Sequence, residues 1–301
     1  MRISALREQI CRRSPERGKN NRGVALIIVI LVTALLIALI FEFAYGTRIS
    51  LRSAVNFRNS ERAYYLARSG VKFAGLLLSY NLKLGNPQAN IEQRDWQVVP
   101  LTSLMTSSND TELPTAGSDD TELKVRWEDE GGKINISNIV KGNTTYNRLV
   151  ILFTNQGIDQ NILDQISTWM IEERRSFYLL TELHQFLSDK DFRKVEDFLT
   201  LAPVTQININ TAPVDVLESI GINANLAAMI VSRRDSEPFK DAGSVADFLG
   251  PTNTMAAGQL TTTSNVVKVD SFATVGGYTK QIDAVITRSA TGYTVNYWRA
   301  L

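Results

Sequence analysis

The sequence predicts an α+β protein, in which a long N-terminal helix packs on a small antiparallel β-sheet and a large all-α insertion interrupts the sheet. Three observations lead to this prediction. An apolar segment passes into an amphipathic helical pattern that continues to residue 85, strand-like alternation occurs in two separate regions, and a helical repeat lies between those regions. The strand regions are residues 86–139 and 262–301, and the insertion is residues 140–261.

The N-terminal helix begins in a segment that suits a membrane. Residues 1–23 carry seven basic and two acidic side chains, a net charge of +5, and Val24 to Phe41 is apolar with Thr33 as its only polar member. Eighteen helical residues span about 27 Å, close to the thickness of roughly 30 Å of the bilayer hydrocarbon core. The basic flank predicts a cytoplasmic N-terminus and an exported remainder, with residues 24–46 as the transmembrane part of the helix.

The exported half of the helix, residues 47–85, has an apolar face. Phe57, Tyr64, Val71 and Leu78 recur every seven residues, and arginine and lysine side chains occupy much of the opposite face. We interpret this stripe as a face that packs against neighbouring subunits. Gly85-Asn86-Pro87 is expected to end the helix.

Two kinds of N-terminal leader fit the apolar segment. A secretory signal would be cut after Ala44-Tyr45-Gly46, before Thr47, which would release a soluble protein. A cut between Gly23 and Val24 would instead remove only the basic residues and leave the apolar segment on the mature chain. A glycine at this junction favours the second interpretation, because it leaves the backbone accessible to a protease at the membrane surface.

The two strand regions contain short alternating segments. Leu123–Trp127 and Lys133–Ile136 predict a hairpin that turns at Glu128–Gly132. Near the C-terminus the predicted strands are residues 265–269, 271–275, 281–288 and 294–298, separated by glycine-containing turns.

The middle of the chain contains a helix, turn, helix pattern that occurs twice. The span from glycine to leucine is 30 residues in one copy and 28 in the other. Between the copies, Asn210 or Thr211 is expected to cap a new helix and Pro213 to lie in its first turn. The matching pairs are Gly157-Ile158 with Gly221-Ile222, Arg174-Arg175 with Arg233-Arg234, and Phe186-Leu187 with Phe248-Leu249.

Composition excludes several kinds of active site. The 301 residues contain 32 basic and 31 acidic side chains, one cysteine and one histidine. Neither an intramolecular disulfide nor a Cys/His zinc site nor a Cys–His nucleophile can form from Cys11 and His184. His184 is therefore expected to be structural or at the surface. We predict no catalytic residues, and hence no enzyme.

Four features resemble one family of exported filament proteins. The junction Arg22-Gly23-Val24 resembles the prepilin-type leader of type IV pilins and type II secretion pseudopilins, so residues 1–23 are interpreted as such a leader and Gly23 and Val24 as the processing site. Ile28 stands at the fifth mature position, where pilin-like subunits usually carry glutamate. With Asp129-Glu-Gly-Gly-Lys-Ile-Asn-Ile136 and Ile207-Asn-Ile-Asn-Thr-Ala212, the order of features is similar to that of the K-type minor pseudopilins (GspK family).

The resemblance implies a subunit that caps the tip of the type II secretion pseudopilus and takes part in protein export across the outer membrane. It implies an inner-membrane location with a periplasmic domain, processing by prepilin peptidase, contacts with other minor pseudopilins and with secreted substrates, and no nucleic acid. Calcium is a possible ligand by the same resemblance, but the acidic loop of relatives is missing after Trp169, and Glu172 and Glu173 are poor replacements. The expected assembly face comprises Ile28, Phe57, Tyr64, Val71 and Leu78, so a charged residue at position 71 should weaken co-assembly.

Two alternative functions remain open at this point. A minor pilin of a type IV pilus would share the same leader and helix. A membrane-anchored helix-hairpin-helix DNA-binding module would share the central repeat, but the third residue of each hairpin is Asp159 or Asn223 rather than glycine. Residues 150–250 also carry eight basic and fifteen acidic side chains, and a net charge of −7 would repel a phosphate backbone.

Overall fold

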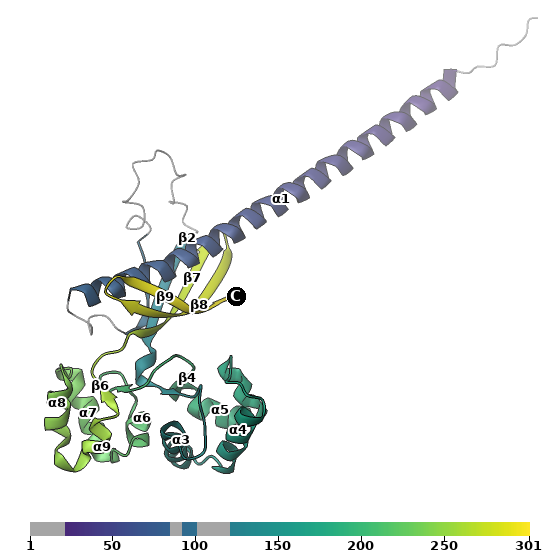
Figure 1. The fold of residues 1–301 in the computed structure, drawn as a ribbon. Coiled ribbons are helices and arrows are strands. Elements are labelled where there is room, and N and C mark those ends of the chain that lie inside the picture. Colours follow the sequence, from purple (N-terminus) through teal and green to yellow (C-terminus); the bar gives the residue numbers. More distant parts are fainter. Residues whose placement is uncertain (1–21, 85–91, 101–120) are drawn as a thin grey trace, which may run out of the picture. The chain divides into compact units, whose positions relative to one another are not determined.

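The structure is a computed structural model that describes residues 22–84, 92–100 and 121–301 (Figure 1). Its contacts divide the chain into two compact units, Met1–Phe57 and Arg58–Leu301, each of which is considered by itself. Helix α1 (Arg22–Lys83) supplies the described part of the first unit and the first element of the second. Residues 1–21 of the predicted leader and Gly85-Asn86-Pro87 lie outside the described residues.

The second unit contains a five-stranded antiparallel sheet with the strand order β1-β2-β7-β8-β9. The predicted α+β class, with a long helix on an antiparallel sheet and an all-α insertion, is confirmed. The predicted strands at 281–288 and 294–298 lie within β8 and β9, and the predicted strands at 265–269 and 271–275 form one continuous strand. The strands are β1 (Gln93–Val98), β2 (Thr121–Asp129), β7 (Val266–Val275), β8 (Tyr278–Ser289) and β9 (Gly292–Ala300).

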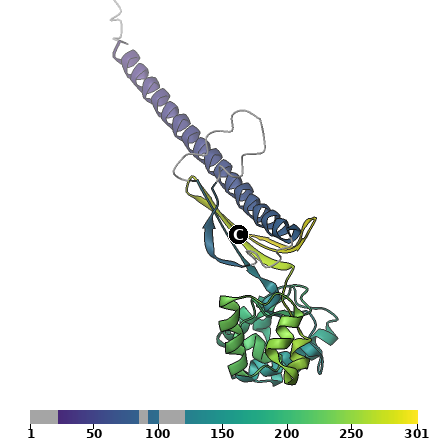
Figure 2. The same cartoon turned by 90° about the vertical axis from the view of Figure 1, so that its left-hand side faces the viewer.

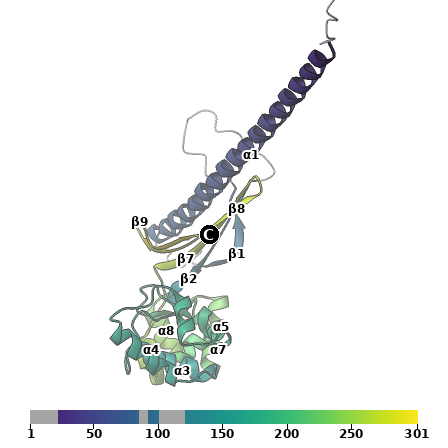
Figure 3. The ribbon, with the colours of Figure 1, turned by 90° about the vertical axis from the view of Figure 1, so that its right-hand side faces the viewer.

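The part of α1 that belongs to the second unit, from Arg58 onward, packs on one face of this sheet (Figures 1 and 3). Small residues bring the two elements close together. A Cβ atom at Gly70 would lie 2.2 Å from Ser271 Oγ, and a Cβ atom at Gly75 would lie 2.7 Å from the Tyr293 ring. Alanine at positions 67 and 74 completes this small-residue surface, and both side chains are buried. The apolar core of the sheet forms beneath it, where branched side chains of β2, β7 and β8 meet the helix.

The helical insertion connects β2 to β7, which are neighbours in the sheet (Figure 2). It has one apolar core of its own. Two parallel strand pairs connect the ends of the insertion to its middle: β3 near its start pairs with β4, and β6 near its end pairs with β5. Its α-helices are α3 (Thr144–Asn155), α4 (Asn161–Glu172), α5 (Asp189–Val195), α6 (Val214–Ser219), α7 (Ala224–Ser236), α8 (Ala242–Leu249) and α9 (Thr254–Ala257). Its short strands and 3-10 turns are β3 (Ile134–Asn135), β4 (Leu199–Thr200), β5 (Ile207–Asn208), β6 (Leu260–Thr261), η1 (Glu130–Gly132), η2 (Leu180–Gln185), η3 (Glu196–Phe198) and η4 (Pro251–Asn253).

The repeat seen in the sequence corresponds to two helical hairpins, α3–α4 and α6–α7. Gly157 and Gly221 follow the first helix of each hairpin with φ of 64° and 94°, a conformation that favours glycine. The aromatic residues after each hairpin also correspond, because Phe177 packs edge-on against Phe186 and Phe239 packs edge-on against Phe248.

Two local predictions are wrong. Lys133–Ile136 does not pair with β2 in a hairpin, since residues 130–132 form η1 and β3 pairs in parallel with β4. The chain leaves the sheet at Asp129 and enters the insertion. Helix α6 has Pro213 at its N-cap position, with no side-chain cap. Asn210 and Thr211 instead make hydrogen bonds to other segments.

Candidate assembly site

The first unit contains a helix that suits membrane anchoring. An 18-residue window of α1 has a mean hydropathy of 3.4, and no part of it is buried within the described chain. The polar group of Thr33 is satisfied inside the helix, because its hydroxyl donates to the carbonyl oxygens of Val29 and Ile30 at 2.9 Å. The segment therefore exposes apolar side chains and leaves no hydroxyl unpaired, as a lipid environment requires.

Gly23 and Val24, the predicted processing site, lie in the first turn of α1. The backbone N–H groups of a first turn have no partner inside the helix, so this turn opens more easily than the rest. Beyond its chain neighbours and the backbone of its own helix, no described atom lies within 4 Å of the position that a Cβ atom of Gly23 would occupy. Ile28, one turn further along, is exposed.

The predicted assembly face is not a single surface. Val71 and Leu78 are 1% and 0% exposed, because they are buried between α1 and the chain's own sheet. Tyr64 is half-buried against the same core. Of the five predicted residues, Ile28 and Phe57 are exposed, and both belong to the first unit. The seven-residue stripe therefore marks mainly the face that α1 turns toward its own sheet, and its assignment as a partner surface is corrected for Val71 and Leu78.

A different face of α1 is exposed and apolar. Tyr65, Leu76 and Tyr80 are 57%, 62% and 60% exposed, and the spacings of eleven and four residues place them on one side of the helix. Phe73 lies half-buried on the same side. These four residues are called the outer face of α1 below. The sequence contained a signal for it, since Leu76 and Tyr80 are apolar yet fall outside the predicted stripe.

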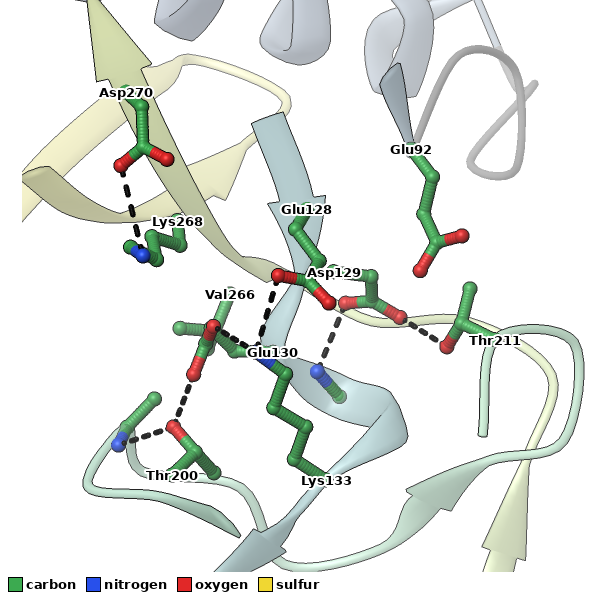
Figure 4. Close-up of polar contacts among 12 residues, drawn as sticks. Glu92, Glu128, Asp129, Glu130, Lys133, Thr200, Thr211, Val266, Lys268 and Asp270 are labelled. Carbon is green, nitrogen blue, oxygen red and sulfur yellow. Dashed lines mark hydrogen bonds and ion pairs between the residues drawn. The ribbon is translucent and has the colours of Figure 1, made fainter. Parts of the chain in front are cut away.

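A buried polar junction joins the sheet to the insertion (Figure 4). The Asp129 carboxylate, at the end of β2, accepts hydrogen bonds from Asn208 Nδ2 and Thr211 Oγ1 at 2.7 Å and from the Gly131 amide at 2.9 Å. Asn208 belongs to β5, so this carboxylate ties the sheet to the centre of the insertion. A Cβ atom at Gly132 would lie 2.8 Å from Thr211 Oγ1, which explains the glycine at this position.

The same junction contains a buried ion pair. Lys133 Nζ donates to Glu130 Oε1 at 3.0 Å and lies 3.2 Å from Glu128 Oε2, while Thr200 Oγ1 donates to the second oxygen of Glu130. Burial alone would lower the pKa of Lys133, but the Glu130 and Glu128 carboxylates outweigh burial and raise this pKa above its ordinary value. The stabilisation from this pair is therefore present at neutral pH and is lost only as the pH rises through the raised pKa.

The two hairpin turns use their own side chains to bind the amides that follow. Asn223 Oδ1 accepts from the Leu226 amide at 2.9 Å, and Asp159 Oδ1 accepts from the Asn161 amide at 3.0 Å. Phosphate binding at the start of a helix requires backbone amides that point toward the ligand and make no hydrogen bond within the protein. With the net charge of −7 over residues 150–250, this geometry disfavours the DNA-binding alternative.

The end of α4 is where the sequence placed the two carboxylates nearest to the missing acidic loop. Glu172 and Glu173 are exposed, and within the described ranges no group of three or more acidic, histidine or cysteine side chains is placed to hold a metal. Arg175 follows them, and its guanidinium lies 4.6 Å from the centre of the Trp169 ring. His184, the one histidine, contacts Asp189 at 3.1 Å and packs its ring on that of Phe192.

An apolar first helix that continues onto an antiparallel sheet defines a pilin-like subunit. No family model matches the chain. The type II secretion system protein K of Pseudomonas aeruginosa is 26% identical over 259 residues, which cover 74% of this chain and 75% of that protein. The crystal structure of the GspK-GspI-GspJ complex from the enterotoxigenic Escherichia coli type 2 secretion system contains a similar chain, with a TM-score of 0.59, 15% identity, and coverage of 83% of this chain and 98% of that one. The solved complex shows that the fold is of the GspK type, and the similarity to the Pseudomonas aeruginosa protein supports a minor pseudopilin of the type II secretion system.

Proposed function

We propose that this minor pseudopilin caps the tip of the type II secretion pseudopilus and thereby takes part in protein export across the outer membrane. It acts as a structural subunit and not as a catalyst. Val24–Phe41 holds it in the inner membrane, with the N-terminus in the cytoplasm and the chain from residue 47 onward in the periplasm. The net charge of +5 on residues 1–23 supports this orientation.

The observation that carries the proposal is where the insertion joins the sheet. Asp129 pairs with Val267, and Val267 pairs with Ile286, which places the insertion at the end of the sheet near Arg288. The Arg288 guanidinium donates to the carbonyl oxygen of Leu78, close to the C-terminal end of α1. The opposite end of the sheet, at the β7–β8 turn, lies by Asn59. The bulky insertion thus stands at the end of α1 that is farthest along the chain from the apolar segment, where it would obstruct a further subunit.

Ile28 supports the same proposal. A carboxylate inside a membrane is costly unless it has a partner. In pilin-like subunits that partner is expected to be the N-terminus of a neighbour, and a tip subunit has no such neighbour above it. The exposed isoleucine at this position therefore suits a subunit that ends the filament.

The outer face of α1 is the surface that we propose contacts other minor pseudopilins. The solved Escherichia coli complex contains GspI and GspJ together with GspK, so co-assembly is the direct test. Replacing the exposed Leu76 by aspartate should reduce recovery of the other minor pseudopilins by about tenfold in pull-downs from detergent-solubilised membranes, because a charge would be buried at the contact. Met255→Asp, at an exposed apolar residue of the insertion, is the matched control. Equal recovery with Leu76→Asp and wild type would contradict this assignment.

A second experiment tests processing of the leader. Gly23→Leu should leave a full-length precursor in the membrane, since a bulky side chain would occupy the residue before the proposed cut, while the open surroundings of Gly23 let the helix form normally. N-terminal sequencing of the membrane-extracted protein is the measurement, with Ala25→Leu as the control. Wild-type protein should begin at Val24. A wild-type chain that begins at Thr47, or normal maturation of Gly23→Leu, would show that the leader is not of the prepilin type.

A further inference from the structure

A groove with a volume of about 400 Å³ lies between α1 and β9, within the second unit. Tyr64 lines it from the helix, and Tyr293 and Trp298 line it from the strand. All three aromatic side chains are only half-buried, so their rings remain available to a ligand. The assembly face described above does not include this groove, because Tyr65, Leu76 and Tyr80 are not among the residues that line it.

Two cations lie along the helix side of the groove. Arg68 and Lys72 are one helical turn apart, and both are exposed. Neither forms an ion pair with a carboxylate in the described part of the chain. Arg68 lies close enough to Tyr293 to oppose the increase in the pKa of that phenol that burial causes. The groove therefore combines aromatic walls with two positive charges that pair with no described carboxylate, and a carboxylate would complement it.

The strand side of the groove is an edge of the sheet. Strand β9 is last in the order β1-β2-β7-β8-β9, so among the described strands it pairs with β8 alone. Edge strands carry backbone N–H and C=O groups that can pair with an added strand. Val295 is 46% exposed at this edge, and proteins that bind extended peptides commonly use such an edge beside a side-chain groove.

We propose that β9 and the adjoining groove bind an extended acidic segment of a partner protein, which adds a strand to the sheet. Alternate side chains of the added strand would face α1. Apolar side chains would contact Tyr293 and Trp298, and carboxylates would pair with Arg68 and Lys72. The edge strand favours a peptide over a nucleic acid, which could use the cations and aromatic rings but not the strand. This docking site does not depend on the tip position proposed above.

The test uses the full chain in detergent micelles and a short peptide in which every second residue is in turn glutamate or valine and the residues between them are serine, so that both kinds of side chain lie on the same face of the added strand. The peptide should bind and slow hydrogen exchange of the β9 amides, while the same peptide with lysine in place of each glutamate should not bind. The double variant Arg68→Glu with Lys72→Glu should weaken binding by at least about tenfold, because two charge-assisted contacts become repulsive. The matched control reverses Arg62 and Lys83, two exposed cations of the same helix outside the groove, and should change the affinity by less than about twofold.

Three results would overturn the proposal. The first is failure of the glutamate peptide to bind, or equal binding of the lysine peptide. The second is binding that leaves exchange in β9 unchanged or survives the Arg68 and Lys72 reversal. The third is binding of a thymidine oligonucleotide in place of the peptide, with loss of that binding in the double variant, which would make the groove a nucleic-acid site.

Discussion

Asp129→Asn is expected to lower the free energy of unfolding of the second unit by about 3 kcal/mol, although the side chain keeps its size. All three contacts of the carboxylate are with donors: Asn208 Nδ2, Thr211 Oγ1 and the Gly131 amide. An asparagine has a single acceptor oxygen, so its NH₂ group must face at least one of these donors in a buried position. The unmatched donor then bears a desolvation cost with no hydrogen bond to offset it.

Chemical denaturation followed by tryptophan fluorescence measures this loss, and limited proteolysis locates it. We expect faster cleavage on either side of the junction, near residues 130–133 and 208–211, because the carboxylate ties these two segments together. Asp247→Asn, at an exposed aspartate of α8, is the control and should change stability by less than about 0.5 kcal/mol. If the two variants were equally stable, the junction would contribute little to the attachment of the insertion.

The role of this junction could not be predicted from the sequence. Asp129 is 79 residues from Asn208 and 82 residues from Thr211 along the chain. Local patterns instead predicted a hairpin around Asp129 and a capping role for Thr211. Both predictions used neighbours in sequence as the partners, whereas two of the three donors to Asp129 come from the centre of the insertion. Periodicity reports on such neighbours and carries no information about long-range polar contacts.

The overall architecture was predictable because each of its parts has a strong local signal. The apolar run from Val24 to Phe41, the alternation in β8 and β9, and the paired Gly-Ile turns each identify an element without knowledge of the others. The surface that contacts partner subunits was harder to predict from the sequence. A seven-residue apolar repeat shows that one face of a helix is buried, but it does not show which element buries it. In this chain the cover of Val71 and Leu78 is the chain's own sheet.

Val71→Asp should therefore unfold the second unit rather than selectively weaken co-assembly. The side chain is buried among apolar residues of α1, β2 and β7 in a core that also contains Leu123 and Val269. An unpaired carboxylate in such a place costs about 3–5 kcal/mol, and the loss of the valine contacts adds to this. This cost is comparable to the stability of many small domains, so the variant should be sensitive to protease at ordinary temperature. The measurement is the denaturation midpoint of the membrane-extracted chain.

Leu76→Asp separates folding from assembly in the same helix. Leu76 lies five residues from Val71 and is mostly exposed, so an aspartate there remains solvated and the midpoint should shift by less than about 0.5 kcal/mol in free energy. Capture of the other minor pseudopilins should nevertheless fall. The opposite pattern, a stable Val71→Asp that loses only its partners, would mean that the stripe through Val71 faces another subunit and that α1 leaves its own sheet when the filament assembles.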